Sequence, residues 1–217
     1  MDAGFWHDKW ERGEIGFHNK QANPLLTDNW SALGIVSGTV FMPLCGKSLD
    51  IAWLLGQGFE VVGAELSELA VGQLFEELGV EAAISDVTPS GSASKLSLWQ
   101  ADGLKVFVGD IFDLSPSILG MVDAVYDRAA IVALPEAVRA SYSQHITHIT
   151  DCAPQLVVCF EYDQSQISGP PFSVDAAEIG RHYDGFYQRD LLMQIDVEGG
   201  LKGKVAASES VWHLYPR

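Results

Sequence analysis

Apolar residues recur along the chain in two patterns, one typical of strands and one of helices. Short apolar runs at 39–44 and 59–66 predict strands, and apolar residues at helical spacing over 48–58 predict a helix between them. Helical spacing returns over 67–79, where Gly79 is placed to end a second helix. Strand, helix and strand in this order make up the βαβ unit of a parallel sheet.

The rest of the chain continues the alternation and ends in two successive strands. Further strands are predicted over 104–110, 121–127, 154–162, 189–199 and 204–215. A helix is predicted near 135–150 and another over 173–183, with Ser173 as its N-cap. Because no helix separates the last two strands, we expect a hairpin at Gly199–Gly200 and an antiparallel last strand.

These elements predict an α/β fold in which residues 1–217 form a single domain. About seven strands are expected in a mostly parallel sheet with helices on both faces. Residues 85–97, SDVTPSGSASKLS, interrupt the alternation. Their Ser, Gly and Pro content predicts a flexible insertion, either a loop or a loose hairpin.

The N-terminal segment, residues 1–30, precedes the first predicted strand and carries Trp6, Trp10 and Phe17. One interpretation is an amphipathic helix that packs these aromatic side chains on the core. The other is a lid over a ligand, in which a tryptophan face near a cation gains about 0.5 to 2 kcal/mol. The pattern of residues leaves both interpretations open.

Composition and charge narrow the class of protein. The chain has no apolar run of the roughly 18 residues that a membrane span needs, and its first residues lack the pattern of a signal peptide, so we expect a cytoplasmic protein. Its three cysteines form no CxxC pair, which argues against a disulfide framework or a zinc ribbon. A net charge of -16 argues against nucleic acid and favours a small neutral or cationic ligand.

The stretch 40–50, VFMPLCGKSLD, ends like a phosphate-binding P-loop but lacks its first glycine, because position 41 is Phe. Pro43 also has no amide hydrogen with which to hold a phosphate. Glu65 follows Gly46 by 19 residues, near the spacing at which an acid accepts hydrogen bonds from ribose hydroxyls. This pattern favours a ribose without a phosphate chain, as in S-adenosylmethionine.

Within this loop, Gly46 would let the backbone approach the ligand, whereas Lys47 and Ser48 are interpreted chiefly as the start of the next helix. Cys45 is conceivable as a nucleophile, but a small packed side chain is favoured, because no histidine partner is assignable. His145 and His148 could share a metal, yet no third ligand stands at a recognisable spacing, so no metal site is expected.

Five segments, 5–18, 40–71, 109–114, 125–135 and 169–174, together resemble the thiopurine S-methyltransferase family, with PLCGKS and YDRAA as the most distinctive pieces. The resemblance implies a Rossmann-like class I methyltransferase fold, S-adenosylmethionine as cofactor, a lid formed by the N-terminal segment, and a monomer. It implies small aromatic or heterocyclic thiols as acceptors. Selenium or tellurium oxyanions, and hence a role in their detoxification, are the alternative.

The resemblance also implies the residues of the site. The cofactor would lie against Trp6, Trp10, Leu44, Gly46, Glu65, Asp110, Ile111 and Arg128. The acceptor would lie against Phe17, Pro171 and Phe172. Independently of the resemblance, the residues at 44, 65, 110 and 128 follow predicted strands, and ligands of open α/β sheets bind at the carboxyl ends of strands.

Arg128 is the candidate catalytic residue, since a cation near the acceptor favours a thiolate. No dedicated general base is assigned. The alternative is that Arg128 only forms an ion pair with Asp127 or another acid. At the level of the whole protein, a nucleotide-binding dehydrogenase and a non-catalytic ligand-binding module stay open as remote alternatives.

Overall fold

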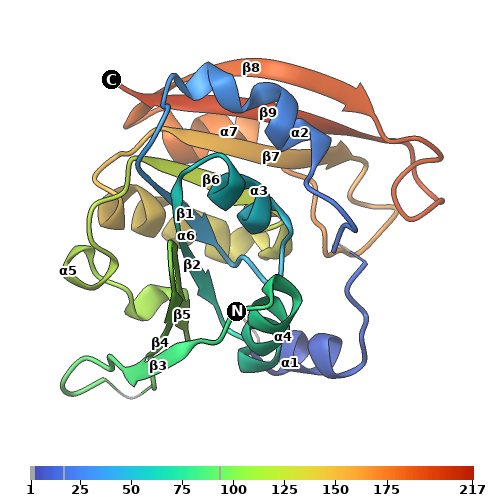
Figure 1. Ribbon diagram of the computed structural model, residues 1–217. Helices are drawn as coiled ribbons and strands as arrows, with labels where there is room; N and C mark the ends of the chain where they lie inside the picture. The colour runs from blue at the N-terminus through green and yellow to red at the C-terminus, as the bar shows by residue number, and fades with distance from the viewer. Residues whose placement is uncertain (1–2, 17, 93) are drawn as a thin grey trace.

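The computed structural model describes residues 3–16, 18–92 and 94–217 (Figure 1). Within these residues one sheet holds nine strands in the order β3-β4-β5-β2-β1-β6-β7-β9-β8. The strands are β1 (Thr39–Pro43), β2 (Glu60–Glu65), β3 (Ala83–Asp86), β4 (Ser97–Ala101), β5 (Leu104–Val108), β6 (Ala124–Arg128), β7 (Gln155–Tyr162), β8 (Tyr187–Asp196) and β9 (Ala207–Pro216). The five central strands, from β5 to β7, pair in parallel, which confirms the predicted α/β class.

The last strand, β9, is antiparallel to both of its neighbours, as predicted. The sheet has nine strands rather than seven, because β3 and β4 form an antiparallel hairpin at its other edge. The predicted insertion 85–97 therefore begins inside β3 and ends at the first residue of β4. All four residues of β3 are exposed, so this edge strand carries no apolar pattern that would predict it.

Helices cover both faces of the sheet, with α3 and α4 in front of it and α6 and α7 behind it in Figure 1. The helices are α1 (Ala3–Glu11), α2 (Pro24–Asn29), α3 (Asp50–Gly56), α4 (Glu68–Leu78), α5 (Pro116–Leu119), α6 (Glu136–Ile149) and α7 (Ala176–Tyr183). None of the described helices is long and apolar enough to cross a membrane. The N-terminal helix α1 lies beside α4, near the carboxyl ends of the central strands.

The end of α4 and the start of α7 test the residues that were predicted to end and to begin these helices. Gly79 ends α4 with a left-handed φ of 68°, as predicted. The predicted N-cap of α7 is wrong: Asp175 caps this helix by accepting a 2.7 Å hydrogen bond from the Glu178 N–H. The side chain of Ser173 instead accepts a hydrogen bond from the N–H of Tyr162, which ties the chain to β7 before the helix begins.

The central strands bury side chains on both faces of the sheet. In β1, Phe41 packs with residues of α6 and α7, whereas Val40 and Met42 pack with residues of α2, α3 and α4. Successive side chains of a strand point to opposite faces, so both must be apolar when both faces are covered. This is why the central strands appear in the sequence as continuous apolar runs.

Asp127 is fully buried in β6, on the face covered by α6. Its carboxylate accepts hydrogen bonds from the N–H of Ile131 at 3.0 Å and from the hydroxyl of Tyr142 at 2.7 Å. Burial raises the pKa of Asp127 from its ordinary value of 3.8 to about 6, against the opposing effect of these donors. The carboxylate is therefore a fixed part of the core that titrates near neutral pH.

This burial predicts a pH-dependent stability. An acid whose pKa is higher in the folded state contributes stability below its unfolded pKa, and the contribution is lost as pH rises through the folded pKa. Between about pH 4 and pH 7 the wild type should lose on the order of 3 kcal/mol relative to Asp127→Asn, because each pKa unit corresponds to about 1.4 kcal/mol. Urea unfolding of both proteins across this range measures the difference in their free energies of unfolding. If the free energies of unfolding of the two proteins changed in parallel with pH, the pKa of Asp127 would not be raised by folding.

Candidate active site

A small cavity of about 60 Å³ lies at the carboxyl ends of β1, β2 and β6, under the N-terminal helix. Its lining includes Trp6, Trp10, Leu44, Gly46, Glu65 and Arg128. Six residues predicted for the cofactor site thus come together in space. Leu44, Glu65 and Arg128 meet because parallel strands present their carboxyl ends at one edge of the sheet, and Trp6 and Trp10 come from α1.

Two residues without glycine's freedom adopt left-handed backbone angles in this cavity. Leu44 follows β1 with a φ of 48°, and Ala129 follows β6 with a φ of 60°. Such angles cost of order 1 to 3 kcal/mol each and persist where the surroundings impose them, often at functional sites. Both turns stand in the lining of the small cavity, at the point where β1 and β6 end.

Glu65, at the end of β2, is 7% exposed. Its carboxylate accepts a 2.9 Å hydrogen bond from the N–H of Gly46 and a 2.8 Å hydrogen bond from the N–H of Ser67. Burial raises the pKa of Glu65, and the hydrogen bonds from Ser67 and Gly46 oppose that rise. A carboxylate offers about four acceptor positions, so two remain for a ligand. Because Glu65 takes the amide of Gly46, the loop offers a negative charge where a P-loop would hold a phosphate.

Lys47 and Ser48 are interpreted from the sequence as the start of the next helix, but both precede α3, which begins at Asp50, and both also line the small cavity. Lys47 forms an ion pair with Glu77 of α4, with 2.6 Å between Nζ and Oε1, and Ser48 accepts a hydrogen bond from the N–H of Asp50 at the start of α3. Cys45 is buried against Gly63, and burial raises the pKa of its thiol well above the usual range. A thiol that stays protonated and packed is a poor nucleophile.

A second, wider cavity of about 750 Å³ adjoins the first, and Leu66 lines both. Its walls include His7 and Glu11 of α1, and Asp110, which follows β5. The carboxylate of Asp110 accepts a hydrogen bond from the N–H of Phe112. Asp110 is thus placed one strand away from Glu65, along the same edge of the sheet.

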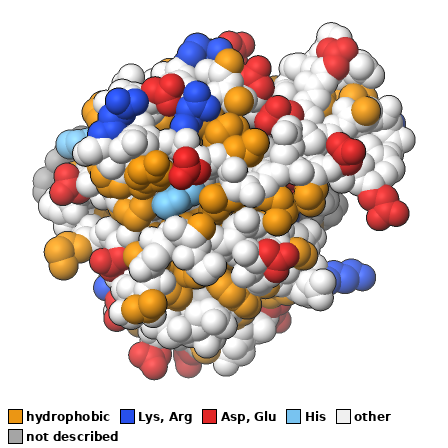
Figure 2. Space-filling view, turned by 90° about the horizontal axis from the view of Figure 1, so that it is seen from above, with side chains coloured by type: hydrophobic (Ala, Val, Ile, Leu, Met, Phe, Trp, Pro, Cys, Tyr) orange, Lys and Arg blue, Asp and Glu red, His pale blue; other side chains and the backbone are white. Residues whose placement is uncertain are grey.

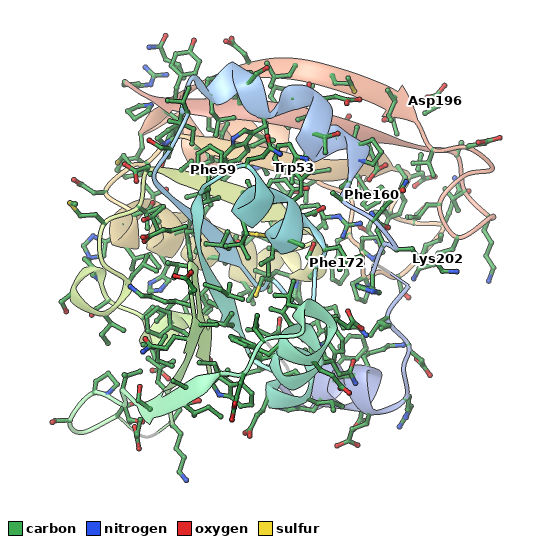
Figure 3. The ribbon with its side chains drawn as sticks, in the orientation of Figure 1. Trp53, Phe59, Phe160, Phe172, Asp196 and Lys202 are labelled. Carbon is green, nitrogen blue, oxygen red and sulfur yellow. The ribbon has the colours of Figure 1, made fainter. Side chains whose placement is uncertain are left out.

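A third cavity, of about 800 Å³, lies on the opposite side of the small one. Trp6, Arg128, Ala129 and Ala133 line both. Its other walls are largely apolar and include Val132, Val158, Phe160, Pro171 and Leu201. Figure 3 labels Phe160 of β7 and Lys202 of the loop between β8 and β9, which lie at one end of the sheet.

Arg128 ends β6 at the border between the small cavity and the third cavity. Asp127, one of the ion-pair partners considered for it, is directed instead to Ile131 and Tyr142. Another acid, Glu209 of β9, lines the third cavity close enough for Arg128 to lower the pKa of its carboxyl. The carboxylate of Asp127 is thus held by groups other than Arg128, and Arg128 lines both cavities.

Four of the predicted residues that the structure describes lie outside the small cavity, namely Asp110, Ile111, Pro171 and Phe172. Ile111 is buried in the core, and its carbonyl oxygen is 2.8 Å from Nε2 of His145. Phe172 lines none of the three cavities; its ring packs against Gly169 and below the guanidinium of Arg139. Pro171 does line the third cavity. Phe17 lies outside the described residues.

Sequence reasoning missed several residues that line these cavities, among them His18, Tyr126, Glu209 and Lys202. Tyr126 precedes Arg128 by two residues in β6, so strand alternation places both on one face. Glu209 offered a weaker signal, since it is an acid within a strand that packs beside a buried one. Nothing in the sequence singles out Lys202, which belongs to a loop.

The family model described as thiopurine S-methyltransferase (TPMT) matches residues 1–214. The chain belongs to the thiopurine S-methyltransferase family. Thiopurine S-methyltransferase of Teredinibacter turnerae is 50% identical over 214 residues, covering 99% of this chain and 97% of that protein. Thiopurine S-methyltransferase of Xanthobacter autotrophicus is 50% identical over 216 residues, covering 99% of each chain.

Solved structures agree on the fold. One match is the 1,6-didemethyltoxoflavin-N1-methyltransferase of Burkholderia thailandensis, whose structure holds 1,6-didemethyltoxoflavin and S-adenosylhomocysteine. The TM-score is 0.66 at 14% sequence identity, and the match covers 99% of this chain and 87% of that one. A S-adenosylmethionine-dependent methyltransferase of Anabaena variabilis matches with a TM-score of 0.60 at 12% identity, over 100% and 96%. This family member therefore has the predicted Rossmann-like methyltransferase fold.

Proposed function

We propose that this chain is a S-adenosylmethionine-dependent S-methyltransferase that acts on small aromatic or heterocyclic thiols. The observation that carries the proposal is the position of Arg128. This cation borders both the small cavity beside Glu65 and the large, mostly apolar third cavity. A methyl donor held on one side and a thiol held on the other would meet next to Arg128.

The residues present fit S-adenosylmethionine. Glu65 keeps two acceptor positions for ribose hydroxyls, and the second cavity beyond Leu66 leaves room for the adenine near Asp110. The amino-acid end would lie at the turn formed by Leu44 and Gly46. Because a volume of about 60 Å³ is far too small for the whole molecule, we propose that α1 moves as a lid when the cofactor enters.

S-adenosylmethionine supplies a methyl group on a sulfonium cation. The protein's residues supply alignment, which can be worth up to about 7 to 11 kcal/mol, and exclusion of water. Trp6 and Trp10 line the small cavity, where an aromatic face attracts a cation. Arg128 favours the ionised form of a thiol by placing a positive charge beside it. No general base is required for a thiol that is already ionised.

We further propose that the acceptor is a small molecule rather than nucleic acid, and that the protein works as a monomer in the cytoplasm. The net charge of -16 supports the first point, since it repels a phosphate backbone. On the face shown in Figure 2, acidic side chains are interspersed with Lys and Arg. The family relationship supports a small thiol acceptor.

Calorimetry tests the cofactor. S-adenosylmethionine is expected to bind, whereas NAD should give no measurable heat, because Glu65 opposes a pyrophosphate near Gly46. Binding of NAD in its place would favour a dehydrogenase. Methyl transfer from labelled S-adenosylmethionine is then measured with thiopurines, thiophenols, selenite and tellurite. Transfer to the thiols supports the proposal, and transfer to the oxyanions alone would replace it with the alternative acceptor class.

A further inference from the structure

Glu209 places a carboxylate in the third cavity. It is the third residue of β9 and lies directly opposite Phe160 of β7, and both residues line the cavity. Glu209 is half-buried, and no hydrogen-bond donor of the described residues reaches its carboxylate. The other acid that lines the cavity, Glu14, forms an ion pair with Lys9. Glu209 is therefore placed to accept a hydrogen bond from a ligand.

The charged groups that face this cavity are arranged in a definite way. Lys9 and Glu14 pair with each other at the lid, and Lys202 donates a 2.8 Å hydrogen bond to the carbonyl oxygen of Pro170. The other two charged residues are Arg128, at the carboxyl end of β6, and Glu209, in β9. Burial raises the pKa of Glu209, and the positive charge of Arg128 opposes that rise, so Arg128 lies close enough to act on this carboxylate.

We propose, building on the function proposed above, that Glu209 accepts the ring N–H proton of heterocyclic thione acceptors while Arg128 faces their sulfur. Such acceptors carry an N–H beside a C=S group, and their sulfur becomes a much stronger nucleophile when that proton leaves. A cation and a hydrogen-bond acceptor on one cavity match the two ends of an N–C=S group. Glu209 is then a catalytic residue for thiones and dispensable for simple thiols.

The proposed step balances in atoms and charge. A bond forms between the thione sulfur and the methyl carbon, while the bond from that carbon to the sulfonium breaks and its electron pair stays on the cofactor's sulfur. The ring N–H proton passes to the carboxylate of Glu209, the ring gains a C=N bond in place of C=S, and Glu209 later releases the proton to water. A thiophenol, which has no ring N–H, needs no such acceptor once it is ionised.

Glu209→Gln tests the role, because glutamine keeps the shape but is a far weaker proton acceptor. With 2-mercaptopyrimidine, a thione, kcat/KM should fall about tenfold. This loss is smaller than the usual contribution of a general base, about 10²- to 10⁴-fold, because Glu209 is only half-buried and water can accept the proton in its place. With thiophenol at a pH where it is ionised, kcat/KM should stay within about twofold. Glu198→Gln is the matched control, since it removes the same charge from an exposed residue that does not line the cavity but directly follows Val197, which does.

The comparison of acceptors separates the possible outcomes. Equal loss for both acceptors, or no loss for either, overturns the role of Glu209 and leaves the proposed function intact. A wild type that methylates neither acceptor defeats the proposed function and this inference with it. Glu209→Asp, which keeps a carboxylate, should recover part of the thione activity, and an equal melting temperature of the variants excludes misfolding.

A spectroscopic measurement tests the same point without turnover. The ultraviolet spectrum of 2-mercaptopyrimidine differs between its thione and deprotonated forms. Bound to the wild type with S-adenosylhomocysteine, it should shift toward the deprotonated form, and the shift should disappear in Glu209→Gln. The same bound spectrum in both proteins would overturn the proposal.

Discussion

Replacing Arg128 by alanine is expected to lower kcat/KM for an aromatic thiol by about 10²- to 10³-fold, similar to the loss of one charge-stabilising donor in other active sites. The reason is its position: Arg128 borders both the small cavity beside Glu65 and the third cavity, which is the proposed acceptor site, so its charge acts where the two reactants would meet. The measurement is a steady-state assay with thiophenol across a range of pH. The rate profile of the variant should move to higher pH, because the thiol loses the charge that favours its ionised form.

The control for this prediction is Arg128→Lys, which keeps a positive charge and should recover part of the lost rate. The free energy of unfolding should change little in both variants, since Asp127 is held by Ile131 and Tyr142 rather than by Arg128. If Arg128→Ala unfolds readily while its folded fraction keeps full specific activity, the residue is structural and its partner is an acid such as Glu209.

The part of the site that could be predicted from the sequence rests on the ends of buried parallel strands. β1 and β2 are continuous apolar runs, so their last residues, and hence Leu44 and Glu65, were fixed within a residue or two. Parallel strands bring such ends together without any knowledge of side-chain packing. The same reasoning placed Arg128 directly after a strand predicted over 121–127, and in the structure it is the last residue of β6. These three residues do line one cavity.

The parts that could not be predicted depend on tertiary contacts or on weak local patterns. β3 is an exposed edge strand, so its residues carry no burial pattern, and Ser173 is drawn to β7 before it can cap a helix. Glu209 lines the third cavity because β9 lies between β7 and β8 in the sheet, which the order of strands in the sequence does not predict. Phe172 is close in sequence to a cavity residue, Pro171, yet its ring packs elsewhere.

The second large effect is expected at Glu65. Alanine there would also leave the buried N–H groups of Gly46 and Ser67 without a partner, so it would cost stability as well as affinity. Glu65→Gln is the sharper change, because the amide keeps the shape and one acceptor oxygen while removing the charge. Glu60→Gln is the matched control, since Glu60 is an exposed residue at the other end of β2.

Glu65→Gln is expected to weaken the binding of S-adenosylmethionine by about 1.5 to 3 kcal/mol, the contribution of hydrogen bonds to a charged group, or about 10- to 150-fold in Kd by calorimetry. Acidification should imitate the substitution. Burial raises the pKa of Glu65. As the pH falls, its carboxylate should therefore be protonated, and the wild type should lose affinity, at a higher pH than if Glu65 were an exposed glutamate. The glutamine variant cannot titrate there, and its affinity should stay flat over the same range. Unchanged affinity in Glu65→Gln, or an equal pH dependence in both proteins, would remove Glu65 from the cofactor site.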